Sequence, residues 1–514
     1  MITLLYIIIH LFFKDILFQL PKQGCKLTAE KSCVDQMISL DEAIKLNKTK
    51  TAILNMTEGN PTSLIIKFSI PMLLGNLFQQ LYNLVDSIVV GQFVGPNALA
   101  AIGATGSSTF MFFALCNGIG SGGGIITAQC FGKGDKKEVK SCIVNTAYIM
   151  AVFPMIIGFT AFMLAKPLLL LLETPADILP DSLSYMRIMC VGIMFMSLYN
   201  YAAAMLRALG DSKTPLYFLI FSCILNTILD IIFVYCFNMS VVGAGIATVI
   251  SQFVSGISSL LYAVKKNEYF KLGKEDLKFN KTLTLRIVRI GIPLSLQFSL
   301  IAISCMALQK VVNGFGPVAM AAFTATSRIE QIIHQPYQTL SAALSTFTGQ
   351  NFGAGKKDRV VLGFHKGAVI MAVFSIAMLP VMQFFGDNII KIFVSDAEVI
   401  EMGAHALRIT SYFYICLGAI YIIRGVLNGL GDAFFALLNG IVEVIGRFAV
   451  PVFLTGIATI GVWGIWWSVG IVWSMAGLSA VIRYRSYIKK LGVKKELKAL
   501  PSPSSKIMPV SAAK

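Results

Sequence analysis

Asn226 and Asp230 stand out in an otherwise apolar run, LIFSCILNTILDIIFVY, that covers residues 219–235. The two residues are four apart, so on a helix their side chains project from the same face, one turn from each other. An ionisable side chain at bilayer depth costs at least ~2.5–3.5 kcal/mol, and it is retained where it faces a protein interior or a watery cavity. We therefore predict a functional pair. The alternative is a helix-packing hydrogen bond from Asn226, with Asp230 at a helix end near water.

A second carboxylate, Asp86, lies in the first long apolar run. Gln79 and Asn83 precede it by seven and three residues, so the three side chains are predicted to form one polar stripe on that helix. Thr248 lies near the start of the sixth apolar run. The sequence thus supplies several oxygen-bearing side chains that membrane-spanning helices would have to bring together.

The composition indicates that these helices lie in a membrane. Only 13% of the 514 residues are charged and 56% are hydrophobic, whereas a soluble domain carries about 25% charged residues. Apolar runs of membrane length recur twelve times, separated by short turns rich in Gly, Pro and Lys. The predicted spans are 64–90, 101–130, 141–166, 183–207, 215–237, 242–264, 284–312, 319–349, 362–386, 403–428, 434–456 and 461–485.

Positive charge alternates between the connections. Lys133–Lys140, Lys265–Arg289, Lys356–Arg359 and the segment after Arg483 are basic, whereas the intervening turns are neutral or acidic. By the positive-inside rule both termini and the basic loops face the cytoplasm. The formal net charge of +17 then needs no nucleic-acid partner. We expect a multi-pass protein of the inner (cytoplasmic) membrane.

The two halves of the chain repeat each other. Gly95-Pro96 matches Gly316-Pro317, and 316 − 95 = 221. The same offset aligns Q-x-F-G-x-G at 129–134 with 350–355, and L-G-D at 209–211 with 430–432. Six spans per half give both halves the same orientation. The predicted fold is all-α, with two six-helix bundles related by a pseudo-two-fold axis along the membrane normal.

The expected domain organisation follows from the repeat. An N-terminal extension covers 1–55, which is short of a full span and precedes a methionine, Met56, that we consider a plausible true start. The N-lobe covers 56–264, a basic cytoplasmic linker 265–289, the C-lobe 290–490 and a basic cytoplasmic tail 491–514.

The doubled Q-x-F-G-x-G loop resembles the multidrug and toxic compound extrusion (MATE) family, as do N-L-V-D-S at 83–87, R-A-L-G-D at 207–211 and N-T-I-L-D at 226–230. The resemblance covers roughly residues 58–490. It implies that Asp86, Asn226, Asp230 and Thr248 bind the coupling cation, with Gln79 and Asn83 as a supporting stripe. Carboxylate, amide and hydroxyl oxygens suit Na⁺. Without a metal, two close carboxylates in a low dielectric cannot both stay ionised, so the site could also take H⁺. A static hydrogen-bond network is the alternative.

The second half does not repeat this site, because Asp86, Asn226 and Asp230 map at the offset of 221 to Ala307, Arg447 and Pro451. The C-lobe instead carries Glu330, Glu443 and Arg447 as candidate substrate or charge sites. Glu443 precedes Arg447 by four residues, so we expect a helical ion pair. Glu330 is a candidate for contacting a cationic substrate, and the alternatives are that it pairs with Arg328 or lies near an interface.

No catalytic signature occurs in the chain. The glycine-rich stretch Gly118–Gly124 lies within a span and lacks the ending of a phosphate loop, so we interpret it as a close helix-packing site or a flexible point. The resemblance implies a secondary transporter that exports organic, cationic or amphipathic compounds by antiport with Na⁺ or H⁺. A flippase of a lipid-linked oligosaccharide or related precursor is the alternative. We expect no cofactor besides the coupling ion. The expected partners are small organic substrates and the lipid bilayer, and we expect a monomer to function alone.

Overall fold

A computed structural model describes residues 54–172 and 174–490, and the elements of this part of the chain are all helices. The N-terminal half contains α3 (Pro61–Phe93), α4 (Pro96–Lys133), α5 (Lys136–Leu171), α6 (Leu179–Ala208), α7 (Lys213–Asp230), η1 (Ile231–Cys236), α8 (Ser240–Lys266) and η2 (Glu268–Phe270). The C-terminal half contains α9 (Lys281–Asn313), α10 (Pro317–Gly353), α11 (Lys357–Ile390), α12 (Ala397–Ser411), α13 (Tyr414–Gly429), α14 (Ala433–Thr455), η3 (Gly461–Trp463) and α15 (Gly464–Lys490).

Each predicted span corresponds to a helix or a helix pair. Within the described residues, ten helices are long and apolar enough to cross a membrane, and α12 with α13 forms an eleventh candidate bent by 53°. The remaining element, α10, is 37 residues long but more polar, and it carries Arg328 and Glu330. The prediction of an all-α membrane protein with twelve spans in two six-helix bundles is confirmed.

The repeat is visible in how equivalent helices begin. Gly95 and Gly316 have φ values of 117° and 87°, and each is followed by a proline at the first helical position. A positive φ favours glycine, while proline is pre-organised for a helix start and needs no hydrogen bond for its missing N–H. The same dipeptide therefore makes the same sharp turn into α4 and into α10.

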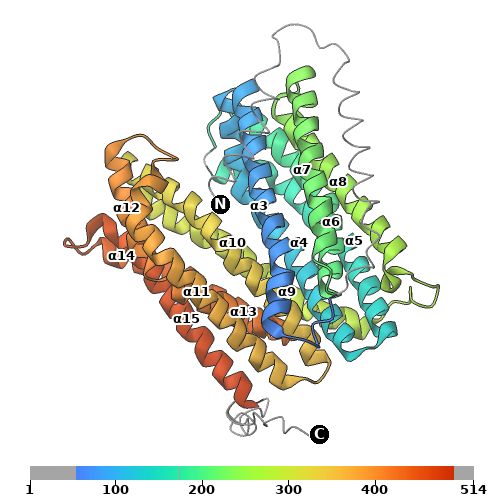
Figure 1. Ribbon diagram of the computed structural model, residues 1–514. Helices are drawn as coiled ribbons and strands as arrows, with labels where there is room; N and C mark the ends of the chain where they lie inside the picture. Colours follow the sequence, from blue (N-terminus) through green and yellow to red (C-terminus); the bar gives the residue numbers. More distant parts are fainter. Residues whose placement is uncertain (1–53, 173, 491–514) are drawn as a thin grey trace, which may run out of the picture. The chain divides into compact units, whose positions relative to one another are not determined.

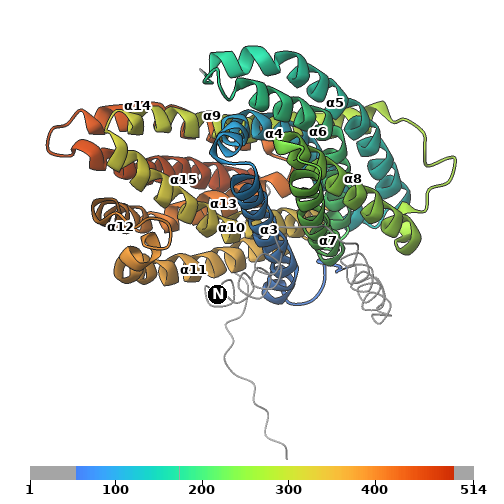
Figure 2. The same cartoon turned by 90° about the horizontal axis from the view of Figure 1, so that it is seen from above.

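Helix α9 packs between the two sets of helices, against α14 on one side and α4 on the other (Figures 1 and 2). The close approach uses the glycine-rich stretch. A Cβ on Gly118 would collide with the backbone of Ser295, and one on Gly122 would lie 2.7 Å from Gly291 Cα. The packing interpretation of this stretch is confirmed.

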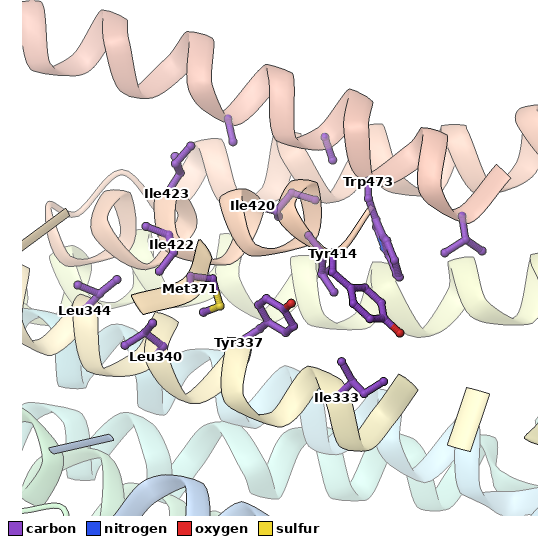
Figure 3. Packing of buried hydrophobic residues seen from close by; sticks show 14 of the residues in the cluster. Ile333, Tyr337, Leu340, Leu344, Met371, Tyr414, Ile420, Ile422, Ile423 and Trp473 are labelled. Carbon is purple, nitrogen blue, oxygen red and sulfur yellow. The ribbon is translucent and has the colours of Figure 1, made fainter. Parts of the chain in front are cut away.

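The C-lobe has a dense apolar core built from α10, α11, α13 and α15. Figure 3 shows Tyr337 and Tyr414 lying side by side in it, with Trp473 of α15 next to Tyr414. The Tyr337 hydroxyl lies 2.9 Å from that of Ser375, so its polar atom is satisfied inside the core. This lobe is held together by large side chains.

The lobes meet through the doubled Q-x-F-G motif. Gln129 Nε2 donates to the Gly429 carbonyl at 2.9 Å, and Gln350 Nε2 donates to the Ala208 carbonyl at 3.0 Å. These contacts are equivalent under the repeat, since 129 + 221 = 350 and 208 + 221 = 429. A Cβ on Gly132 or Gly353 would collide with the carbonyl of Gln350 or Gln129, respectively. We call Gln129, Gly132, Gln350 and Gly353 the clasp.

The clasp lies at the end of the helices that carries the basic connections, which we call the basic end. Gln129 is four residues before Lys133, and Gln350 is six residues before Lys356. The lobes are joined at this end by residues 267–280. This connection is shorter than the predicted linker 265–289, because Lys265 and Lys266 still belong to α8 and α9 already begins at Lys281.

The segment Leu54–Gly59 also binds at the basic end. Leu54 N donates to the Gly210 carbonyl at 3.3 Å, and Met56 N donates to Gln350 Oε1 at 3.0 Å. Met56 is fully buried. Residues 1–53 and 491–514 lie outside the described residues, and so do most of the expected extension and the whole expected tail.

Candidate functional site

Asn226 and Asp230 lie on α7 and are both fully buried. Asp230 is the last residue of α7, and the chain continues at once as the π-helix η1. A π-helix is uncommon and is often found at functional sites, because its wider turn shifts the helix face. The sequence pattern predicted one continuous α-helix here and had no signal for the change of helix type.

Asp86 of α3 and Thr248 of α8 complete the predicted group of four. The carboxyl groups of Asp86 and Asp230 are within hydrogen-bonding reach of each other. With its amide nitrogen facing Asp230, Asn226 donates to Asp230 Oδ2 at 2.9 Å and accepts from Thr248 N at 3.2 Å. The four residues, predicted from three separate spans, therefore meet inside the N-lobe, with Thr248 joining Asn226 through its backbone N–H. Residues of α3 and α8 reach α7 because both helices pack against it.

Two tyrosines adjoin this group. The Tyr82 hydroxyl donates to Thr248 Oγ1 at 3.1 Å, and Thr248 in turn donates to the Ala244 carbonyl at 3.0 Å. Tyr185 of α6 is buried and interacts electrostatically with both carboxylates. Tyr82 precedes Asp86 by four residues, so the helical spacing that links Asn226 with Asp230 could also have found it. Tyr185 has no such signal in the sequence.

The predicted polar stripe on α3 is not brought together with the site. Asn83 is exposed and Gln79 is half-buried, whereas Asp86 is buried. Among the described residues, neither side chain has a hydrogen bond to Asp86, Asn226, Asp230 or Thr248. Tyr82, one turn before Asp86 on α3, is the residue that reaches α8. Gln79 lies on the same side of the helix but about two turns, roughly 10 Å, farther along its axis.

The site leaves two carboxylate oxygens without partners. Asp86 Oδ1 and Asp230 Oδ1 are buried and accept no hydrogen bond in the described part of the chain. None of the ion pairs found among the described residues includes either acid. Unpaired buried carboxylate oxygens are costly, so a dry protein interior retains them where a cation or a proton completes them.

In the C-lobe the predicted pair Glu443–Arg447 is wrong. Glu443 binds Arg424 of α13 instead, at 2.5 Å, with both side chains buried. Arg424 also donates to Asn439 Oδ1 at 2.6 Å. A partner on a facing helix can offer a straighter hydrogen bond than a residue one turn along the same helix, so the cross-helix pair forms.

The other two C-lobe candidates make their hydrogen bonds elsewhere, although Arg447 still interacts electrostatically with Glu443. Arg447 Nη1 donates to Ser304 Oγ at 3.1 Å and lies 3.1 Å from Cys305 Sγ. Glu330 is half-buried, hydrogen bonds to Thr410 and interacts electrostatically with Arg447, and its Oε1 atom has no partner among the described residues. Arg328 is exposed and forms no ion pair with Glu330 in this part of the chain. Glu330 and Arg447 thus present opposite charges from two helices.

Comparison with solved structures shows the same fold. A structure of MATE in the straight conformation matches with a TM-score of 0.81 at 24% identity, covering 86% of this chain and 100% of that chain.

Curated relatives match along most of the chain. The probable multidrug resistance protein YpnP of Bacillus subtilis (strain 168) is 29% identical over 435 residues, which cover 84% of this chain and 96% of that protein. The probable multidrug resistance protein NorM of Thermotoga maritima is 24% identical over 433 residues, covering 83% of this chain and 91% of that protein. The family model described as MatE matches residues 71–232 and, a second time, residues 293–450. The chain therefore belongs to the MatE family, the transporters of multidrug and toxic compound extrusion that its doubled motifs resemble.

Proposed function

We propose that this protein exports organic, cationic or amphipathic compounds in exchange for Na⁺ or H⁺ bound between Asp86 and Asp230. The observation that carries the proposal is the pair of buried, unpartnered oxygens on two acids that contact each other. Two carboxylates this close in a dry interior hold one proton between them, and Na⁺ would take the place of that proton. The names of YpnP and NorM support the substrate class.

In the proposed mechanism, the cation binds at the two acids, far from the clasp where the lobes close. Asp86 is 86 − 61 = 25 residues after the start of α3, which at ~1.5 Å per residue places it roughly 38 Å from the basic end of that helix. Closing the lobes at the basic end and binding a cation near the other end are therefore separate events. A cation drives the cycle only if its affinity differs between the state with the clasp closed and the state with it open.

We further propose that the basic end faces the cytoplasm of an inner-membrane protein, because basic connections are retained on that side. Cysteine reporters near Lys136, Lys274 and Lys357 should then react only from the cytoplasm, and reporters near Asn97, Asn238 and Ile457 only from outside. Labelling near Lys274 from outside would contradict this orientation.

Transport into inverted membrane vesicles tests the function. Ethidium should accumulate when a Na⁺ or a pH gradient is imposed, and the gradient that works identifies the ion. Asp230→Asn should accumulate no more than vesicles without the protein, at matched expression and with equilibrium ethidium binding retained. If wild-type vesicles move a labelled lipid-linked oligosaccharide and leave ethidium outside under both gradients, the protein is a flippase and the proposal is wrong.

A further inference from the structure

The two halves differ at equivalent positions of the basic end. In one half, Leu54–Gly59 covers the position beside Gln350 and Gly210, where Leu54 N binds the Gly210 carbonyl and Met56 N binds Gln350 Oε1. The equivalent position in the other half lies beside Gln129 and Gly431, since 350 − 221 = 129 and 210 + 221 = 431. There the structure has a cavity of about 540 Å³. The described residues fill one of the two positions and leave its counterpart open.

Two arginines line this cavity. Its lining includes Gln129, Arg286, Arg289, Gly431, Asp432 and Phe434. Arg286 and Arg289 are three residues apart on α9, so they lie on the same side of the helix. Arg286 Nη2 donates to Gln129 Oε1 at 2.8 Å, and neither arginine forms an ion pair with a carboxylate of the described residues.

The single carboxylate of the lining is already engaged. Asp432 Oδ2 accepts from Arg483 Nε at 2.8 Å. Around the cavity, the described residues therefore supply two arginines without an ion pair and one acid neutralised by a third arginine. A site with this balance attracts an anion, and the planar fork of a guanidinium matches the oxygens of a phosphate.

The surroundings of the cavity are apolar and exposed. Leu285 and Phe434 are 65% and 61% exposed, on helices of a chain that spans the membrane. Basic pockets between membrane helices at the level of the interface hold anionic lipid headgroups. A lipid can place its phosphate at the arginines while its chains lie against such apolar side chains, which a soluble phosphate has no means to use.

We propose that this cavity binds the phosphate of an anionic phospholipid between Arg286 and Arg289, and that the bound lipid holds Arg286 against the clasp residue Gln129. The chain segment that follows α15 is a poor occupant, because residues 491–514 contain five lysines and one glutamate. The proposal is independent of the transported compound and of the coupling ion.

Lipid binding to the purified full-length protein tests this inference, with fluorescent phosphatidylglycerol and phosphatidylcholine as probes. The wild-type protein should prefer phosphatidylglycerol, and Arg289→Gln should weaken its binding about tenfold, because one charge-assisted contact is lost. Lys67→Gln is the matched control. Lys67 is an exposed basic residue of the covered half. The dipeptide Ile70-Pro71 recurs as Ile292-Pro293, 222 residues later, and this local offset makes Lys67 the equivalent of Arg289 (67 + 222 = 289). Loss of Lys67 should leave binding unchanged.

Three outcomes would overturn the proposal. Equal phosphatidylglycerol binding by wild type and Arg289→Gln would show that the cavity is not the site. An equal loss in Lys67→Gln would show general attraction by surface charge. Displacement of the lipid by an equal concentration of glycerol 1-phosphate would show a site for soluble phosphates. Elution of each variant from a sizing column at the wild-type volume confirms that the compared proteins are folded.

Discussion

The N-lobe and the C-lobe share a plan, but the acid pair of the N-lobe and the Arg424–Glu443 pair of the C-lobe are neutralised differently. In the N-lobe, Asp86 and Asp230 contact each other and keep oxygens without partners. In the C-lobe, Glu443 is paired with Arg424, and Arg424 is held further by Asn439. An acid that is paired with an arginine is already neutralised and gains little from binding a cation. An unpaired buried acid is stabilised by any cation that reaches it. On the proposed coupling, the Asp86–Asp230 pair would respond to the ion, whereas the Arg424–Glu443 pair would not. Glu330 is the C-lobe acid that also keeps an oxygen without a partner among the described residues.

The basic ends of the lobes differ in a similar way. Asp211 accepts from Lys213 N and Thr214 N at 3.1 and 3.0 Å, so it caps the start of α7. The equivalent Asp432 makes no such cap and binds Arg483 instead. The same L-G-D motif thus stabilises a helix within one lobe and joins α14 to α15 in the other. Equivalent residues in a repeat need not have equivalent partners.

The largest effect is expected when the acids of the two lobes are neutralised in turn. Asp86→Asn and Asp230→Asn should each abolish the response of ethidium transport to an ion gradient, because each removes a charge on which the cation depends. Glu330→Gln and Glu443→Gln should retain that response per molecule of inserted protein. An undiminished gradient response in Asp230→Asn would move the coupling site to the C-lobe.

The second-largest effect is expected at the clasp, where the two lobes make equivalent contacts. Gly132→Ala and Gly353→Ala should both lower the yield of folded protein severely and to a similar extent, since each added Cβ collides with a backbone carbonyl of the other lobe. Gly106→Ala in the same helix as Gly132 is the control, because no atom lies within 4 Å of its Cβ position. Size-exclusion yield in detergent measures the effect. Loss in only one of the two variants would refute the equivalence.

Breaking the buried C-lobe pair should destabilise that lobe without changing the ion specificity. Arg424→Met leaves Glu443 buried and unpaired, which costs about 3–5 kcal/mol. Replacing both residues, by Arg424→Met with Glu443→Leu, should recover most of this loss, because no charge then remains buried. Thermal unfolding in detergent monitors the change. A double variant as unstable as Arg424→Met alone would show that the pair is needed for more than neutralisation.

Two truncations distinguish the contribution to stability of the segment Leu54–Gly59, which covers Gln350, from that of the residues before it. A chain begun at Met56 should be nearly as stable as the full chain, because it keeps the contacts of Met56, Thr57 and Gly59 with the C-lobe. A chain begun at Asn60 behind an initiator methionine should lose roughly 2–5 kcal/mol, the range for removing a buried methionine side chain. Equal melting temperatures for the two truncations would show that this segment does not stabilise the basic end.

The smallest effect is expected at Asp276, in the connection between the lobes. The Gly273 N–H and Lys140 beside it hold the pKa of its carboxyl below the ordinary value. A lowered folded-state pKa adds stability above the unfolded pKa, and that stability is lost as the pH falls. Asp276→Asn should therefore lower the melting temperature slightly at pH 7, by at most about 2 °C, and by progressively less as the pH falls below the ordinary pKa of an aspartate. A loss that grows on acidification would contradict this sign.

The sequence predicted the fold well because membrane length, Gly-Pro turns and a repeat at one offset are local signals. It also predicted four site residues from intramembrane polarity and family resemblance, and the structure brings all four together. It failed where the outcome depends on which helices face each other. Glu443 forms its ion pair with Arg424 and not with Arg447. Asn83 is exposed, whereas Tyr82 is buried and binds Thr248. Periodicity places a residue on a face of its helix and cannot say what that face meets.

The contacts of Leu54–Gly59 also constrain the order of biosynthesis. Met56 binds Gln350 and Arg359, which lie 294 and 303 residues later in the chain. At ~5–20 residues per second, these partners leave the ribosome about 15–60 s after Met56 does. Asp86, Asn226, Asp230 and Thr248 all belong to the first half, so the acidic site can form before the second half is made. The clasp can close only after the second half has been made as far as Gly429, and until Gln350 and Arg359 emerge Met56 lacks the partners that it has in the folded protein.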